Sequence, residues 1–237
     1  MQLFISDLHL SERRPGTLTL FEHFIQSLAP QSEALYILGD FFDYWIGNDD
    51  QSAFHRHVQG LLKKLSQGDT LVFMLPGNRD FLLDEKFTQN SGATLIEDPH
   101  LITFNNASYL LMHGDTLCTQ DWKYQIFRKL VRSRLFRQCF LSLSLSIRRK
   151  LAKNMRDKSR RSQAGRPYVL AYEPTVAQIF KTYPIDALLH GHTHEEKIYT
   201  YPLLDKKRFV LGEWTDTHGS YLKLDHTGVS LHPYSHP

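Results

Sequence analysis

The sequence predicts an α/β fold with one inserted helical segment. Short apolar runs alternate with longer amphipathic stretches, which is the pattern of strands and helices that share a core. The 237 residues are 41% hydrophobic and 22% charged, so an ordinary buried core is available. Residues 121–166 interrupt the alternation with dense positive charge. We therefore expect one domain over residues 1–237, with a basic and apolar helical cap inserted at 121–166.

Each strand and helix is expected from its own pattern. Amphipathic spacing predicts helices at Thr17–Leu28 and Ala53–Leu65. Continuous apolar runs predict buried strands at Leu3–Ser6, Leu35–Gly39, Leu71–Leu75 and Tyr109–Met112. Further strands are expected near 95–96, 101–104, 108–112, 186–190, 197–201, 208–211, 219–224 and 228–232. Their close spacing predicts that the second half of the chain is richer in antiparallel strands.

The cap segment holds most of the positive charge. Between Lys123 and Arg166, 15 Lys and Arg accompany one acid, Asp157, so this stretch carries +14 and the rest of the chain −11. The run 140–147 alternates with period two, as in a strand, but its flanks are rich in Arg and Lys and free of Gly and Pro, so we expect a helix. Charge of this density favours an anionic partner: nucleic acid, a membrane surface or a phosphorylated substrate. A solvated helix face is the simpler alternative.

Three further features of the sequence indicate where in the cell the protein is expected. No run reaches about 18 consecutive apolar residues, so no membrane-spanning helix is expected. The N-terminus has no basic region and candidate site residues begin at Asp7, so we expect no signal peptide. Cys118 and Cys139 are the only cysteines. One disulfide is an alternative, but two reduced thiols in a cytoplasm are favoured.

Five short polar motifs follow predicted strands. In open α/β sheets, ligands bind beyond the carboxyl ends of the strands. Each motif alone is weak, since Gly-Asp is usually a turn, but five of them in this position predict one site. The motifs are Asp7-Leu8-His9, Gly39-Asp40-Phe41-Phe42-Asp43, Gly77-Asn78-Arg79-Asp80, His113-Gly114-Asp115 and Gly191-His192-Thr193-His194.

The side chains in these motifs predict metal ions. Two Asp, one Asn and four His make an oxygen and nitrogen ligand set that suits Mn²⁺, Fe or Zn²⁺ and not a structural zinc finger. Seven ligands are too many for one ion with open positions, and suit two ions about 3.5–4 Å apart that share a carboxylate and activate a water. The seven are Asp7, His9, Asp40, Asn78, His113, His192 and His194.

In this order the motifs resemble those of the calcineurin-like metallophosphoesterases, over positions 7 to 194. The resemblance implies a β-sandwich flanked by helices in four layers. It implies that Asp40 bridges two metals, and that Asp40, Asn78, Arg79 and His113 are the catalytic residues. The first metal would be held by Asp7, His9, Asp40 and His194, and the second by Asp40, Asn78, His113 and His192.

Arg79 departs from the usual pattern of that family, which has a His at this position to assist the leaving group. Such help benefits an alkoxide leaving group, whereas cleavage of a diphosphate expels a phosphate, which leaves more readily. An always-charged, bidentate Arg suits a diphosphate better than a titrating imidazole. Arg79 therefore favours a diphosphate substrate. The simpler alternative is that Arg79 pairs with Asp80 or Asp84.

Further short sequence segments resemble those of a subfamily that acts on UDP-2,3-diacylglucosamine in the lipid A biosynthesis of Gram-negative bacteria. They are residues 39–47, 77–80, 155–159, 211–214 and 219–220. The resemblance implies hydrolysis of this substrate to UMP and 2,3-diacylglucosamine 1-phosphate by a peripheral protein at the cytoplasmic face of the inner membrane, with two Mn²⁺. The implied substrate contacts are Asn78, Arg79, Asp121, Tyr124, Arg156, Ser159, Gln163, Arg166 and His192.

Three alternatives remain open from the residues alone. A nuclease of the same superfamily would use the cap cations on a phosphate backbone, but the apolar residues between them are aliphatic and Phe, with few Tyr or Trp for base stacking. A non-catalytic scaffold would be expected to have lost ligands, and all seven are present. Another nucleoside-diphosphate hydrolase would not need the cap. We expect no nucleic acid partner and infer no obligate protein partner.

Overall fold

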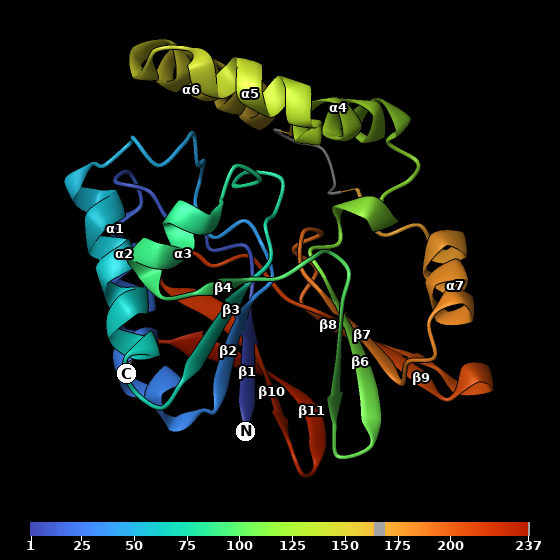
Figure 1. The fold of residues 1–237 in the computed structure, drawn as a ribbon. Helices are drawn as coiled ribbons and strands as arrows, with labels where there is room; N and C mark the ends of the chain where they lie inside the picture. The colour runs from blue at the N-terminus through green and yellow to red at the C-terminus, as the bar shows by residue number, and fades with distance from the viewer. Residues whose placement is uncertain (164–168, 237) are drawn as a thin grey trace.

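Two β-sheets packed face to face form the centre of the molecule (Figure 1). The structure is a computed structural model that describes residues 1–163 and 169–236, with the backbone alone at 158–163. The first sheet has the order β11-β10-β1-β2-β3-β4. Its strands are β1 (Gln2–Ile5), β2 (Ala34–Ile37), β3 (Leu71–Met74), β4 (Thr94–Leu95), β10 (His218–Asp225) and β11 (Gly228–Ser235).

The second sheet has the order β5-β6-β7-β9-β8. Its strands are β5 (His100–Phe104), β6 (Ala107–Met112), β7 (Ala187–His190), β8 (Lys197–Tyr201) and β9 (Lys206–Val210). Strands β1 to β4 pair in parallel, whereas β5–β6, β8–β9, β1–β10 and β10–β11 pair antiparallel. Every predicted strand is present, with ends shifted by no more than three residues. The expected excess of antiparallel pairing in the second half is also confirmed, although β6, β7 and β9 run parallel.

Helices cover the outer face of each sheet. The first sheet carries α1 (Pro15–Ser27), α2 (Ala53–Ser66) and α3 (Glu85–Ser91), and the second carries α7 (Glu173–Thr182) (Figure 1). Single turns of 3₁₀ helix lie at Ala29–Gln31, Asp115–Leu117 and Pro202–Leu204. The termini of α3 show why it forms: the Asp84 carboxylate accepts from Lys86 N at 2.9 Å, and Gly92 ends the helix with a left-handed φ of 70°.

Three apolar clusters hold the layers together. Leu3 and Ile5 of β1 face α1 and α2, whereas Phe4 between them faces the second sheet. This alternation puts apolar side chains on both faces of the parallel strands, which are buried on both sides. A third cluster, which includes Val176 and Phe180, packs α7 on the second sheet. The order helix, sheet, sheet, helix confirms the predicted four-layer architecture.

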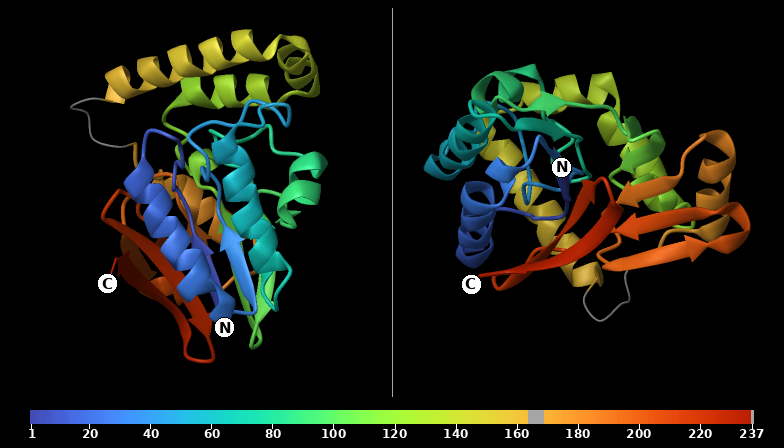
Figure 2. Two further views of the ribbon diagram at one scale, coloured as in Figure 1. Left: turned by 90° about the vertical axis from the view of Figure 1, so that its left-hand side faces the viewer. Right: turned by 90° about the horizontal axis from the view of Figure 1, so that it is seen from below.

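Three helices within residues 122–163 lie across one end of both sheets (Figure 2). They are α4 (Trp122–Arg132), α5 (Arg134–Ser142) and α6 (Leu145–Gln163), and we refer to them as the cap helices. The run 140–147 is not one helix as predicted, because Leu143 has the extended conformation (φ −71°, ψ 150°) and separates α5 from α6. Among the described residues, no helix has the length and apolarity needed to cross a membrane. Cys118 and Cys139 are both free thiols.

Candidate metal centre

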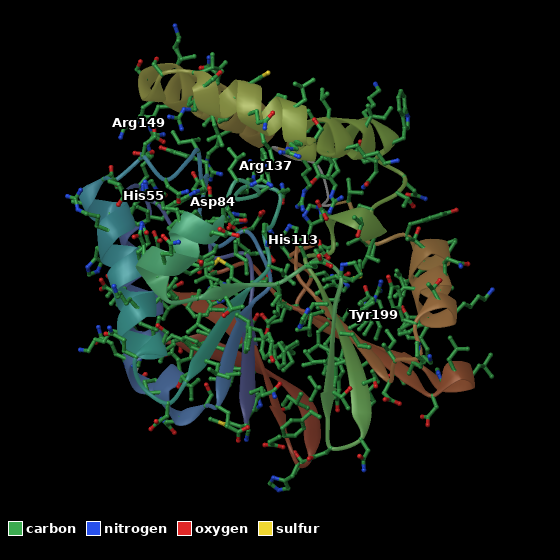
Figure 3. The ribbon with its side chains drawn as sticks, in the orientation of Figure 1. His55, Asp84, His113, Arg137, Arg149 and Tyr199 are labelled. Atoms are coloured by element: carbon green, nitrogen blue, oxygen red, sulfur yellow. The ribbon has the colours of Figure 1, made fainter. Side chains whose placement is uncertain are left out.

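The seven candidate ligands come together at the seam between the two sheets. Asp7, Asp40 and Asn78 follow β1, β2 and β3 of the first sheet, whereas His113 follows β6 of the second. His192 and His194 follow β7 of the second sheet, and His9 lies two residues after Asp7. Figure 3 places His113 at the sheet end that faces the cap helices. Each sheet therefore supplies only part of the set.

Backbone strain marks the same residues. Five of the seven have positive φ, a region that non-glycine residues rarely occupy, at a cost of about 1–3 kcal/mol each. These are Asp7 (57°), His9 (49°), Asp40 (51°), His192 (68°) and His194 (54°). Hydrogen bonds between the motif loops hold this conformation, including Asp7 N to Gly39 O at 3.1 Å and His9 N to Asp40 O at 2.9 Å. Strain of this kind concentrates at functional sites.

Two motif glycines allow the loops to approach closely. A Cβ on Gly77 would lie 2.2 Å from Asp40 N and Oδ1, and one on Gly191 would lie 2.1 Å from Asp7 Oδ2. Both distances are far below van der Waals contact, so no larger residue fits without displacing a carboxylate. The glycines therefore serve the packing of the ligand loops.

The ligand atoms form two overlapping groups. Oxygen and nitrogen atoms of Asp7, His9 and His194 lie within 4.8 Å of one another, and so do those of Asp7, Asp40 and His113. His194 Nε2 is 3.3 Å from Asp7 Oδ1, and His113 Nε2 is 3.7 Å from Asp40 Oδ1. His9 Nδ1 lies 3.9 Å from Asp40 Oδ2 and connects the groups. Asp7 is common to both groups, whereas Asp40, the bridge that the resemblance implies, belongs to the second group only.

Asn78 and His192 complete the second group. The Asn78 amide lies 2.9 Å from His113 Nε2 and 2.7 Å from Asp40 Oδ2. The His192 ring packs on that of His113 with centroids 5.0 Å apart, and its backbone N–H donates to Asp7 Oδ2 at 2.8 Å. The predicted ligands are thus all brought to one place.

The residues fit divalent metal ions on two grounds. His9 Nδ1 is buried and has no hydrogen-bond partner among the described residues, so the imidazole nitrogen is left for a ligand. Asp7, Asp40 and Asp80 are buried carboxylates close enough to interact electrostatically. Burying like charges without compensation is costly, and bound cations would supply that compensation.

Protons compensate the same charges in the metal-free protein. Burial raises the pKa of Asp40 to about 7. Burial lowers the pKa of His113, but the carboxylates of Asp40, Asp7 and Asp115 outweigh it and raise that pKa to about 9. The pKa of His194 is raised to about 11, because hydrogen bonds to Asp7 and Glu213 outweigh burial. Metal binding would displace these protons.

Side chains outside the set hold the ligand loops in place. Asp80 Oδ1 accepts from Gly77 N at 2.7 Å and Oδ2 accepts from Phe41 N at 2.8 Å, so Asp80 joins two motifs. Asp84 caps α3 and accepts from Asn48 Nδ2 at 2.5 Å. Asp80 and Asp84 were the alternative ion-pair partners considered for Arg79, and both accept hydrogen bonds from other residues.

Glu213 was not among the predicted site residues. Its Oε2 lies 3.1 Å from His194 Nδ1, and its Oε1 accepts from Arg14 at 3.2 Å. The signal in the sequence is its place in Leu211-Gly-Glu-Trp214, directly after a strand. Because Arg14 is 199 residues away, the sequence does not show this contact.

A cavity of about 430 Å³ lies over the ligands and beneath the cap helices. Six of the nine predicted substrate contacts line it: Asn78, Arg79, Asp121, Tyr124, Arg156 and His192. Tyr124 OH donates to Asp115 Oδ2 at 2.8 Å, and Arg156 pairs with Asp43. Ser159 and Gln163 belong to α6, whose side chains are not described there, and Arg166 lies outside the described residues.

Known proteins are similar to this chain in sequence and in fold. Residues 2–196 match the calcineurin-like phosphoesterase family. The chain is 41% identical over 234 residues to a UDP-2,3-diacylglucosamine hydrolase of Edwardsiella ictaluri, covering 97% of this chain and 90% of that protein. It is 42% identical over 230 residues to the Haemophilus influenzae protein of the same name, covering 95% of each.

The fold is also similar to a solved structure of Vacuolar Protein Sorting 29 from Cryptosporidium parvum. That structure has a TM-score of 0.50 at 12% sequence identity, and the match covers 99% of this chain and 97% of the other. The similarity shows the fold alone, whereas the sequence match extends through all five motifs, from Asp7 to His194. The resemblance inferred from the motifs is confirmed, and the chain belongs to the calcineurin-like phosphoesterase family.

Proposed function

We propose that this hydrolase cleaves the diphosphate of UDP-2,3-diacylglucosamine, releasing UMP and 2,3-diacylglucosamine 1-phosphate for lipid A biosynthesis. One observation carries the proposal. A metal-ligand set with Arg79 beside it lies under basic, partly apolar helices, in a chain at least 41% identical over nearly its full length to hydrolases named for this substrate.

The chemistry follows from the residues in the cavity. Asp7, His9, Asp40 and His194 would hold one ion and Asp40, Asn78, His113 and His192 the other, with Mn²⁺ proposed in both places. When bound, the ions supply a nucleophilic water and neutralise phosphate charge. Arg79 stabilises the charge that develops on the diphosphate. Asp80 and the strained loops fix the ligands, so little reorganisation accompanies the reaction.

The cap helices supply the proposed contacts to the acyl chains, the sugar and the phosphate of the substrate. Phe127 and Met155 line the cavity and are partly exposed, as a site for acyl chains would be. Asp121, Tyr124 and Arg156 line it and are proposed contacts to the sugar and phosphate. Ser159, Gln163 and Arg166 of the same segment are proposed as further contacts. We propose that residues 121–166 act as a cap and that the protein works at the cytoplasmic face of the inner membrane, as a peripheral protein.

Hydrolysis of UDP-2,3-diacylglucosamine with and without Mn²⁺ tests the function, with UMP release as the signal. In ¹⁸O-labelled water, label should enter UMP, because the attack is proposed at the phosphorus that bears uridine, in line with the departing lipid phosphate. Label in the lipid phosphate would place the attack on the other phosphorus. Cleavage of DNA or RNA in preference to this substrate would support a nuclease instead.

Two variants separate the ligands from Arg79. Asp40→Ala is expected to lose most activity and bound metal, because it removes the proposed bridge. Arg79→Ala should lower kcat by on the order of a hundredfold while metal content stays at the wild-type level, because Arg is not a ligand. Metal analysis of both purified variants decides. Two retained ions and near-normal turnover in Asp40→Ala would reject the assignment.

A further inference from the structure

A second, larger cavity adjoins the metal centre. It has a volume of about 630 Å³ and lies between α6 and the loops at residues 10–13 and 43–55. Figure 3 shows Arg149 on α6 above and His55 at the start of α2 below. Arg156 lines both this cavity and the one over the ligands, so the two meet at Arg156. The loop 10–13 begins directly after His9.

One face of α6 forms the roof. Arg149, Lys150, Lys153 and Arg156 line the cavity at a spacing that places them on the same side of a helix. They span about 10 Å along the helix axis, which is the length of a nucleoside monophosphate. The roof therefore runs from the metal centre outward for the length of such a molecule.

Two of these cations form ion pairs that connect α6 with the loop on the other side of the cavity. Arg149 Nη2 donates to Asp50 Oδ1 at 2.5 Å, and Arg156 pairs with Asp43, so each joins α6 to the loop below. Lys150 and Lys153 are exposed and form no ion pair with any residue that the structure describes, and the same holds for Glu12 across the cavity. These three side chains remain to bind a ligand.

The floor is aromatic and polar. Tyr44, Phe54 and His55 line it, and Tyr44 and Phe54 are partly exposed. A nucleoside suits this lining. The aromatic side chains can stack on its flat, uncharged base, and the Glu12 carboxylate can accept hydrogen bonds from the hydroxyl groups of its sugar. Phe127, Met155 and Val169 line the cavity over the ligands, whereas the apolar side chains of this cavity are Leu10, Tyr44 and Phe54.

We infer that the cavity between α6 and the loops is the subsite for the nucleoside, with Lys153 and Glu12 as specificity-determining residues. The inference rests on the proposed function, in which one substrate carries both a nucleoside and acyl chains. The substrate would then lie across the metal centre, with its nucleoside under residues 149–156 and its acyl chains toward Phe127. The reacting diphosphate falls between them, beside Arg79.

Binding of UMP to purified variants tests the inference. Lys153→Ala and Glu12→Ala should each raise the dissociation constant of UMP by roughly tenfold, the value of one hydrogen bond to a charged group. Affinity for 2,3-diacylglucosamine 1-phosphate should stay within about twofold. Lys129→Ala is the matched control, because it removes one exposed cation from cap helix α4, outside this cavity. The Lys129→Ala variant should bind UMP, and release it from UDP-2,3-diacylglucosamine, as the unmodified protein does.

A second measurement needs no substitution. UMP should slow acetylation of Lys153 in the unmodified protein, as read by mass spectrometry, and leave acetylation of Lys129 unchanged. Unchanged UMP affinity in both variants overturns the inference, as does a selective loss of affinity for the acylated product, which would place acyl chains in this cavity. UMP binding that depends on Lys153, in a protein that releases no UMP from UDP-2,3-diacylglucosamine, supports the subsite and rejects only the proposed substrate.

Discussion

Among the cap-helix side chains that the structure describes, Arg148 is the most deeply buried cation. Its side chain is 3% exposed, bonds to Asp49 Oδ1 at 2.9 Å and donates to Ile46 O. The loop below must pass very close to the guanidinium, and Gly47 makes this possible with a φ of 128°. Gly47 therefore permits one of the contacts, that of Arg148, by which α6 is joined to the body of the protein.

Gly47→Ala should destabilise the protein by about 1–3 kcal/mol, because the added Cβ would lie 2.5 Å from Arg148 Nη1 and the φ is unfavourable for alanine. Chemical denaturation measures the change. Gly60→Ala is the control, since Gly60 is inside α2 and a Cβ there meets nothing within 4 Å. It should stabilise by up to about 1 kcal/mol. Equal stability of the two variants would reject the role given to Gly47.

Metal affinity should fall as the pH falls. The raised pKa of His113, about 9, and that of Asp40, about 7, mean that both side chains hold protons in the metal-free protein below those values. The ions bind the deprotonated forms, so between pH 9 and pH 7 affinity for Mn²⁺ should weaken by at least about tenfold per pH unit, and more steeply below pH 7. Titration calorimetry in buffers of different ionisation enthalpy counts the protons released. A pH-independent affinity would contradict the shifts.

At the scale of elements, α4 joins two ligand loops. Arg132 donates to Gly77 O at 2.8 Å, next to Asn78, and Arg128 donates to Asp115 Oδ2 at 2.6 Å, two residues after His113. The helix thus contacts one loop from each sheet. Its position is expected to influence how Asn78 and His113 are presented to a metal.

Arg132→Met should weaken Mn²⁺ binding and lower kcat, each by roughly tenfold, because the loop that carries Asn78 loses its hydrogen bond to α4. The unfolding midpoint should change little. Lys129→Ala on the same helix is the control and should leave both constants at wild-type values. A normal affinity for Mn²⁺ in Arg132→Met would show that α4 does not position this loop.

Helices and strands were predictable from the sequence where the residues that determine them are close together in the chain. Buried parallel strands such as Leu71–Met74 are continuous apolar runs, so their positions were predicted closely. Helix α3 is short and buries only Phe87 and Ser91, so its sequence shows too little helical periodicity to predict it. The break at Leu143 is likewise too local to leave a periodic pattern. Metal ligands were predictable because their spacing within each motif is short, whereas Glu213 meets His194 through the packing of separate loops.

At the scale of the whole molecule, charge is strongly divided. The segment from Lys123 to Arg166 carries +14 in a chain whose net charge is +3. The cap helices also expose large apolar side chains, among them Trp122, Leu130 and Leu135. The cap helices lie on the side of the molecule that covers the metal centre (Figure 1).

Anionic vesicles should therefore bind the protein more strongly than neutral ones, since each Lys or Arg near an anionic surface contributes about 1 kcal/mol. Salt should weaken the attraction, because the Debye length falls from about 10 Å at 0.1 M to about 3 Å at 1 M. Co-sedimentation with vesicles of either composition, at low and high salt, measures this. Equal binding to both, unaffected by salt, would leave only the apolar side chains to explain membrane attachment.

The strand order of the first sheet has a consequence for synthesis on the ribosome. Strand β1 pairs on one side with β2 and on the other with β10, where Leu3 lies opposite Lys223. Strand β1, which is translated before β10, thus keeps an open edge until residues 218–225 have left the exit tunnel. His192 and His194 also emerge late, so the ligand set that begins at Asp7 cannot be complete on a shorter nascent chain. A ribosome stalled before residue 218 should therefore carry a chain that still binds chaperones.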